Sequence, residues 1–187
     1  MARSMRSRKW ALGEAWAPGT CGELVQGRIG GQDFLVTCPV DLYSRARVEL
    51  RGLTPRVRGT GCPAPCMTVR PGLPGGGWKT LQAVSRTLET LGFTATEAWV
   101  DVDSLIPVSK GMASSSADIS AASWATARAV GVPINPWQVA KVALSIEPTD
   151  GVMFPGCVIL DHRTGQCVHG LGQPPPMRVL VVDTGGE

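Results

Sequence analysis

Three segments of the chain have the pattern of a helix. From 78 to 91 the apolar residues recur with the spacing of one helix face, and Gly92 ends the pattern. From 114 to 130 an alanine-rich run continues without a breaker until Gly131. A third apolar face follows Pro136, which stands at the position that proline favours in a first helical turn.

Other segments have the pattern of strands. The apolar run 34–40 predicts a buried strand, whereas 43–50 alternates and predicts a strand with one solvated face. The glycine pair at 30–31 predicts a hairpin turn between the early strands. The run 98–103 is rich in strand formers and leads into a loop that contains proline and glycine.

The remaining segments are less regular. Proline and glycine between 15 and 27 predict a shaped loop or a bent strand. Residues 52–77 predict a long connection with one short strand at 67–70. Two short runs on either side of 163–165 predict a hairpin, and 177–183 predicts a last strand.

Composition favours a globular protein without a strong charge. Of the 187 residues, 43% are hydrophobic and 18% are charged, which suffices for one domain with a core. The net charge of +3 is too small to indicate a nucleic-acid partner, and the basic run at 3–9 is typical of a solvated tail. No apolar stretch has the form of a membrane span or a secretion signal, so we expect a cytoplasmic protein with no membrane partner.

The six cysteines raise the question of a metal site. Cys62 and Cys66 have a spacing that could serve zinc, and Cys157 and Cys167 lie close to two histidines. A structural zinc site usually needs a second close pair of ligands, which the sequence does not offer. Reduced cytosolic thiols are therefore the simpler interpretation.

The segment with the richest chemistry precedes the helix at 114–130. It reads Ile106-Pro107-Val108-Ser109-Lys110-Gly111-Met112-Ala113-Ser114-Ser115-Ser116-Ala117-Asp118. The first N–H groups of a helix lack intrahelical partners and carry partial positive charge, so a glycine-containing loop in this place can bind phosphate. Lys110 adds a mobile full charge, and the serines add hydroxyl oxygens. The same residues also fit a serine-rich, capped helix start without any ligand.

Two carboxylates, Glu147 and Asp150, follow the third predicted helix. Pro148 turns the chain away from helical geometry, so both side chains stand at a helix exit and could line a cleft. Ordinary loop chemistry at a helix end explains the same pattern. A P-loop is not predicted at 77–80, because Trp78 interrupts the required Gly-Lys-Ser/Thr.

Two of these segments resemble motifs of the GHMP kinases. The run 107–115 resembles their second motif, Pro-X-X-X-Gly-Leu-Gly-Ser-Ser-Ala, with Met112 in place of leucine and Ala113 in place of glycine. The first replacement is mild, whereas the second loses left-handed freedom and brings a Cβ near the ligand. The run 18–27 (Pro-Gly-Thr-Cys-Gly-Glu-Leu-Val-Gln-Gly) resembles the first motif, which lies near the acceptor site, although alone it also fits an edge hairpin.

The chain is most similar to the branch of this family that phosphorylates L-threonine for cobalamin synthesis, over about residues 15–187. Cys38-Pro39-Val40, Ala117-Asp118-Ile119 and Glu147-Pro148-Thr149-Asp150 add to the likeness. The resemblance implies an α+β fold, that of the GHMP kinase N-terminal domain, which is of the ribosomal protein S5 domain 2 type. It implies a basic tail at 1–12 and this domain at 13–187, with the C-terminal GHMP domain and its third glycine-rich motif absent from the chain.

The resemblance also implies a role for each candidate residue. ATP would be held by the loop, and Mg²⁺ by Ser115 and Glu147. Asp150 would orient or deprotonate the hydroxyl of the acceptor, and Lys110 would add charge compensation. Glu23 is expected on the acceptor side. The positive charge of Arg163, rather than the resemblance, suggests this residue as a contact of the threonine carboxylate. The expected ATP-binding residues are Pro107, Val108, Ser109, Lys110, Gly111, Met112, Ala113, Ser114, Ser115 and Ser116.

Two other functions fit the same sequence. One is a GHMP kinase for another small alcohol such as homoserine, and the other is a non-catalytic nucleotide-binding fragment. An N-terminal domain by itself would leave its cleft open and expose apolar surface. For such a chain we expect partial stability, little threonine kinase activity and self-association, for example as a homodimer.

Overall fold

The structure is a computed structural model. It describes residues 10–56, 66–69, 77–166 and 168–182, without the side chains of Glu23 and of residues 66–69. The basic run at 3–9, Cys62 and Cys167 therefore lie outside the described residues. Within the described ranges, none of the helices combines the length and the apolar character that a membrane span requires.

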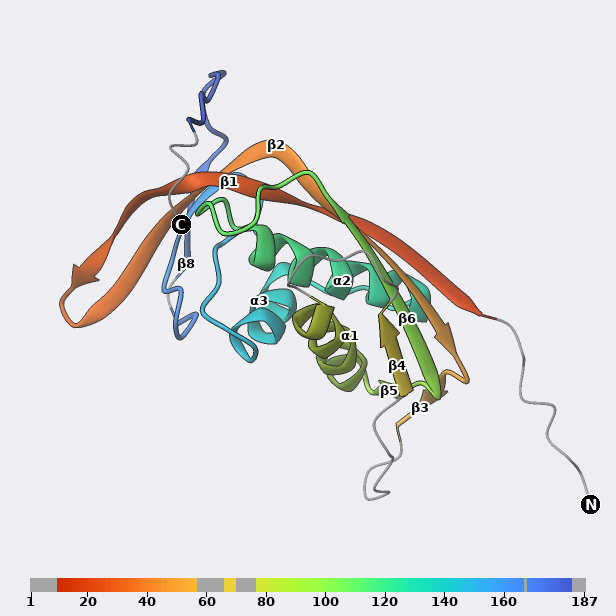
Figure 1. The fold of residues 1–187 in the computed structure, drawn as a ribbon. Helices are drawn as coiled ribbons and strands as arrows, with labels where there is room; N and C mark the ends of the chain where they lie inside the picture. The colour runs from red at the N-terminus through yellow and green to blue at the C-terminus, as the bar shows by residue number, and fades with distance from the viewer. Residues whose placement is uncertain (1–9, 57–65, 70–76, 167, 183–187) are drawn as a thin grey trace, which may run out of the picture.

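A mixed sheet forms the upper layer of the molecule (Figure 1). Its long central strand β2 (Gln32–Arg51) pairs on one side with β1 (Ala11–Ile29) along nearly its whole length. On the other side β2 pairs with β6 (Glu97–Ser104) and, further along, with β7 (Cys157–Leu160). All three pairings are antiparallel. Because β2 takes part in each of them, it connects both halves of the sheet.

Shorter strands complete the sheet and add a small second pair. β4 (Cys66–Val69) lies parallel to β6, and β8 (Val168–Gly172) lies antiparallel to β7. Beside the main sheet, β3 (Thr54–Pro55) pairs with β5 (Phe93–Thr94).

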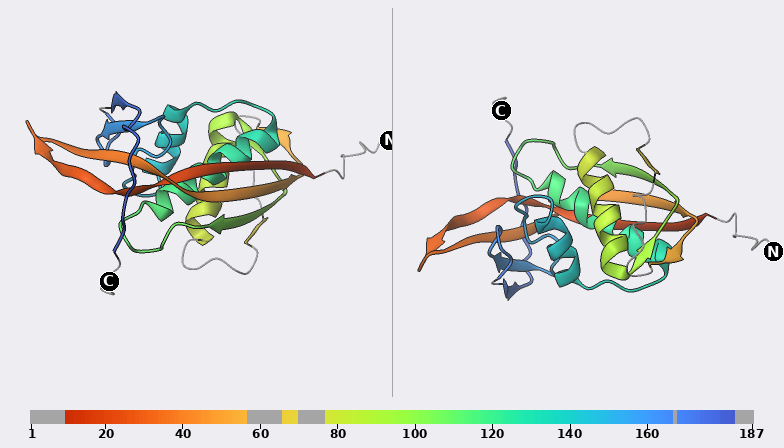
Figure 2. Two further views of the ribbon diagram at one scale, coloured as in Figure 1. Left: turned by 90° about the horizontal axis from the view of Figure 1, so that it is seen from above. Right: turned by 90° about the horizontal axis from the view of Figure 1, so that it is seen from below.

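Three helices cover one face of this sheet, as the views from above and below show (Figure 2). They are α1 (Gly77–Leu91), α2 (Ser114–Val130) and α3 (Pro136–Leu144). Helix α2 packs on β1 and β2 and contacts both other helices. The chain is thus an α+β domain, as the sequence predicts.

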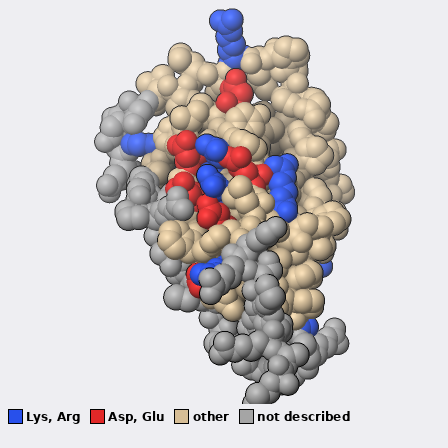
Figure 3. Space-filling model, turned by 90° about the vertical axis from the view of Figure 1, so that its right-hand side faces the viewer, with Lys and Arg blue, Asp and Glu red and all other residues tan. Residues whose placement is uncertain are grey.

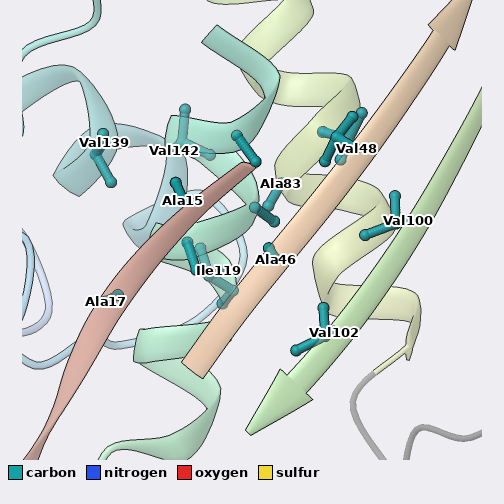
Figure 4. Close-up of a cluster of buried hydrophobic side chains, with 14 of the residues drawn as sticks. Ala15, Ala17, Ala46, Val48, Ala83, Val100, Val102, Ile119, Val139 and Val142 are labelled. Atoms are coloured by element: carbon teal, nitrogen blue, oxygen red, sulfur yellow. The ribbon is translucent and has the colours of Figure 1, made fainter. Parts of the chain in front are cut away.

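Small residues allow α2 to approach the sheet closely. A Cβ added at Gly13 would lie 1.9 Å from the carbonyl oxygen of Ala125, so glycine is required where β1 crosses the helix. Buried valines of β2 and β6 fill the remaining space against Ile119 and Ala83 of the helices (Figure 4). This packing fixes where α2 begins relative to the strands.

Most predicted elements are confirmed. The three helices end or begin where the pattern indicates, and Gly92 and Gly131 have φ values of 75° and 77°. The 15–27 segment is a bent strand with register shifts between Pro18 and Val25, and the glycine pair at 30–31 forms the hairpin turn. The second hairpin is present, and the short strand of the long connection lies at Cys66–Val69.

Two expectations differ from the structure. The predicted last strand is wrong for its described part, because residues 177–182 form no strand and pair with none of the described strands. An apolar run alone does not make a strand, and here Leu180 is 88% exposed. At the other end, β1 begins at Ala11, so the sheet takes in the last residues of the tail expected at 1–12.

Acidic and basic side chains are interspersed on the side of the molecule shown in Figure 3. Ion pairs also join neighbouring strands: Arg51 of β2 lies 3.4 Å from Glu97 of β6. These two side chains are 39% and 40% exposed, so solvent screens the pair and it adds little stability.

Candidate functional site

The loop between β6 and α2 lines a cavity of about 410 Å³. Residues 108, 109 and 111–113 of this loop and residues 114–116 of the first turn of α2 contribute to the lining. The exposed Pro107 and Lys110 belong to the same loop but do not line this cavity. The other lining residues come from α1, α2 and the segment after α3, and they are Lys79, Asp118, Glu147, Pro148 and Asp150.

Helix α2 begins without a side-chain cap. Its N-cap residue is Ala113, in the left-handed conformation at φ 60° and ψ 31°, and a methyl group accepts no hydrogen bond. The alternative of a serine-capped helix start therefore does not hold. A left-handed alanine costs roughly 1–2 kcal/mol, and the first-turn N–H groups receive no side-chain acceptor from the cap.

The serines of the first turn contact carboxylates instead. Ser115 Oγ donates a hydrogen bond to Glu147 Oε1, and Lys79 Nζ lies 2.6 Å from Glu147 Oε2. The ammonium group also lies 3.2 Å from Ser115 Oγ. Three elements thus bring a hydroxyl, a carboxylate and a positive charge to one point, although Ser115 and Glu147 are 32 residues apart in the chain.

The neighbouring serine holds the second carboxylate. Ser116 Oγ donates to Asp150 Oδ2 at 3.1 Å and accepts the backbone N–H of Asp150 at 3.1 Å. The N–H of Gly151 donates to Thr37 Oγ1 at 2.9 Å, and Thr149 N–H donates to the carbonyl of His162 at 3.0 Å. The segment that carries Asp150 is therefore fixed by β2, by α2 and by the turn after β7.

Asp118 is a third carboxylate at the cavity. Burial raises the pKa of its carboxyl group, while a hydrogen bond from Ser44 Oγ at 2.5 Å and the positive charge of Lys79 act in the opposite direction. The net effect is a raised pKa, so the protein disfavours ionisation of this carboxyl group.

The first motif segment supports the loop from behind. The buried Thr20 donates its N–H to the carbonyl of Met112 at 3.0 Å, and a Cβ added at Gly19 would lie 2.9 Å from the same oxygen. Close contact between the two motif segments thus needs glycine at position 19. Glu23 lies on the same strand, opposite Thr37 in the register, and its side chain is outside the described part.

Arg163 lies apart from the cavity. Its Nε is 3.6 Å from Asp33 Oδ2, and its side chain is 65% exposed. It belongs to the turn after β7, where Asp161 accepts hydrogen bonds from the N–H groups of Arg163 and Thr164 at 3.1 and 2.9 Å. The structure thus brings Ser115, Glu147 and Asp150 together at the cavity and does not bring Arg163 there.

Two charged residues at the cavity were not predicted as site residues, Lys79 and Asp118. Lys79 precedes the buried Ala83 and Thr87 by four and eight positions, so a lysine stands on the buried stripe of an amphipathic helix. A charged residue on the buried face of a helix was the sequence signal that could have identified Lys79 as a site residue. For Asp118 we find no comparable local signal, since its burial depends on the sheet above it.

Known proteins resemble this chain over most of its length. Residues 78–156 match the model of the family described as GHMP kinases N terminal domain. An L-threonine kinase from Salmonella typhimurium is 38% identical over 91% of this chain and 51% of its own length. An L-threonine kinase from Citrobacter freundii is 33% identical over 91% of this chain and 54% of its own length. The chain therefore spans about half the length of these curated relatives.

Solved structures share the fold at much lower identity. A mevalonate diphosphate decarboxylase from Legionella pneumophila has a TM-score of 0.59 over 87% of this chain and 54% of that structure, at 14% identity. Such low identity supports the fold alone. Together with the match at 78–156, this likeness shows that the chain has the fold of a GHMP kinase N-terminal domain.

Proposed function

We propose that the protein is a small-molecule kinase that transfers the terminal phosphoryl group of ATP to the hydroxyl of L-threonine. The observation that carries this proposal is the pair of contacts Ser115–Glu147 and Ser116–Asp150 at the uncapped start of α2, in one cavity. The matched relatives named L-threonine kinase support the choice of acceptor. The product, O-phospho-L-threonine, would serve cobalamin synthesis, as the motif resemblance implies.

In this proposal the start of α2 binds the phosphates. The N–H groups of a first helical turn carry partial positive charge and point away from the helix, which suits phosphate oxygens. The loop at 107–116 carries these groups to the cavity, and the hydrogen bond between Thr20 and Met112 keeps the loop in place. Lys110, exposed on this loop, is proposed to add a positive charge when the nucleotide binds.

The oxygen donors of the cavity fit a magnesium ion. Ser115 Oγ and the Glu147 carboxylate are hard ligands of the kind that Mg²⁺ prefers, and the nearby ammonium of Lys79 supports the view that this point attracts a cation. A magnesium ion held there would offset charge on the phosphate oxygens during transfer.

Asp150 is proposed to orient and deprotonate the threonine hydroxyl. Ser116 and the backbone contacts of its segment restrict the carboxylate, and such positioning accounts for much of the rate of phosphoryl transfer. Glu23 is proposed as an acceptor-side contact. A contact of Arg163 with the threonine carboxylate would require the guanidinium group to leave Asp33.

The test measures ADP release by the full-length protein with ATP and a panel of L-threonine, L-serine and L-homoserine. ADP release that depends on threonine supports the proposal. A preference for homoserine would mean that homoserine, rather than threonine, is the acceptor. Binding of Mg-ATP without ADP release for any hydroxy acid would favour the non-catalytic alternative.

Calorimetry tests the phosphate site independently. Ser115→Ala should weaken Mg-ATP binding by about tenfold or more, because a hydrogen bond to a charged group is lost. Ser145→Ala at the end of α3, where the hydroxyl donates to Val142 O, is the matched control. Equal affinities in folded wild type and Ser115→Ala would contradict the assignment of this loop.

A further inference from the structure

The ammonium group of Lys79 occupies the point that the proposed function assigns to a metal ion. It contacts Glu147 Oε2 at 2.6 Å and Ser115 Oγ at 3.2 Å, the two residues proposed as metal ligands. The Lys79 and Glu147 side chains are 26% and 21% exposed, so this ion pair is shielded more than an ordinary surface pair.

The charges around the cavity explain why a cation is needed there. Among the described residues that line it, one lysine faces three carboxylates, Asp118, Glu147 and Asp150. A cavity with that balance repels phosphate until positive charge enters. Lys79 neutralises only part of the negative charge of the three carboxylates. Its side chain is flexible, so the ammonium group can move by several ångströms.

We infer that Lys79 is a resident counter-cation: it holds Ser115 and Glu147 together while no metal is bound, and a divalent cation that binds these residues displaces it. This inference rests on the proposed function for the nature of the ligand. Lys79 is a positioning residue for the metal-free site and becomes free to contact phosphate oxygens once displaced.

Displacement follows from size and charge. Mg²⁺ binds oxygen ligands at about 2.0–2.1 Å, and an ammonium that contacts the same oxygens would lie within about 5 Å of it. At that separation a single and a double positive charge repel each other appreciably, even at the dielectric constant of water. The released ammonium remains at the wall of the cavity beside residues 111–116, where phosphate would lie.

The first experiment titrates the full-length protein with Mn²⁺ alone and measures free Mn²⁺ by electron paramagnetic resonance. Lys79→Met keeps the apolar stem and removes the competing charge, so it should bind Mn²⁺ at least about tenfold more tightly than wild type. The same variant should bind Mg-ATP about tenfold more weakly, because the phosphates lose a charge-assisted contact. Opposite changes for metal and nucleotide are not expected of a purely structural ion pair.

Matched variants identify the site. Lys79→Arg keeps the charge and should retain a Mn²⁺ affinity near that of wild type. Lys141→Met, in the last turn of α3, removes an exposed lysine elsewhere and should change neither affinity. Glu147→Gln should abolish tight Mn²⁺ binding in both the wild-type and the Lys79→Met background. Unchanged or weaker Mn²⁺ binding in folded Lys79→Met, or no Mn²⁺ binding by any variant, would overturn the inference.

A second experiment needs no variant and covers the case in which Lys79→Met does not fold. Mass spectrometry measures the rate at which acetic anhydride labels Lys79 in wild type, with Lys141 as internal reference. Saturation with Mg²⁺ should raise labelling of Lys79 several-fold, because its ion pair with Glu147 breaks, and should leave Lys141 unchanged. An unchanged rate would overturn the inference even if threonine kinase activity is found, and a raised rate would support it even if threonine is not the acceptor.

Discussion

The substitution Ser116→Ala removes the hydroxyl that ties the start of α2 to Asp150. Ser116 is only 3% exposed, and its hydroxyl both donates to the carboxylate and accepts the backbone N–H of Asp150. Alanine keeps the helix and fits the space, so the change isolates the two hydrogen bonds.

The expected loss of stability follows from these two bonds. A hydrogen bond to a charged group is worth about 1.5–3 kcal/mol, and a neutral one about 1 kcal/mol. Asp150 is half-buried, so water can reach part of the released carboxylate, and we expect a net loss of about 2 kcal/mol. With an m-value of about 2–3 kcal/mol/M in urea, the unfolding midpoint should fall by about 1 M.

Urea unfolding followed by tryptophan fluorescence measures this loss, and steady-state kinetics measures its effect on the proposed reaction. We expect kcat to fall while the affinity for Mg-ATP changes little, because Asp150 loses its fixed position. Ser114→Ala changes a half-buried serine of the same helical turn and is the control for the urea midpoint alone. A midpoint for Ser116→Ala that equals that of Ser114→Ala would refute the view that Ser116 holds the Asp150 segment.

Two further predictions concern carboxylates. Asp150→Asn should lower kcat about 10²–10⁴-fold with little effect on Mg-ATP affinity, and a near-normal kcat would move the proposed base to Glu147. The pKa of Asp161 is lowered: burial opposes this, but hydrogen bonds from the Thr164 hydroxyl and from the N–H groups of Thr164 and Arg163 outweigh it, with a smaller contribution from His162. Its stabilisation should therefore be present above the unfolded pKa of about 3.9 and be lost as the pH falls through the lower folded value. Asp161→Asn should flatten the dependence of the urea midpoint on pH between about 5 and 2, and an unchanged slope in the variant would contradict this assignment.

The sequence by itself determines the elements whose causes are local. Apolar spacing predicts the three helices, and glycines that adopt positive φ mark the ends of α1 and α2 and the turn at 30–31. The motif segments could also be found, because Pro107, Gly111 and the three serines follow one another in the chain. Ser115 belongs to this run, whereas Glu147 and Asp150 were named as candidates from their place at a helix exit and from the family resemblance.

The tertiary structure decides which of these groups meet. Lys79 reaches Glu147 across 68 residues, and Asp118 accepts a hydrogen bond from Ser44, 74 residues away on β2, so neither contact leaves a trace in local periodicity. Serine favours helix caps by propensity, but Ser115 and Ser116 hydrogen-bond to carboxylates. The N-cap residue is instead Ala113, in the left-handed conformation. The run at 177–182 has the composition of a strand but pairs with none of the described strands. Propensity acts within a few residues, whereas side-chain partners and strand pairing depend on how distant elements pack.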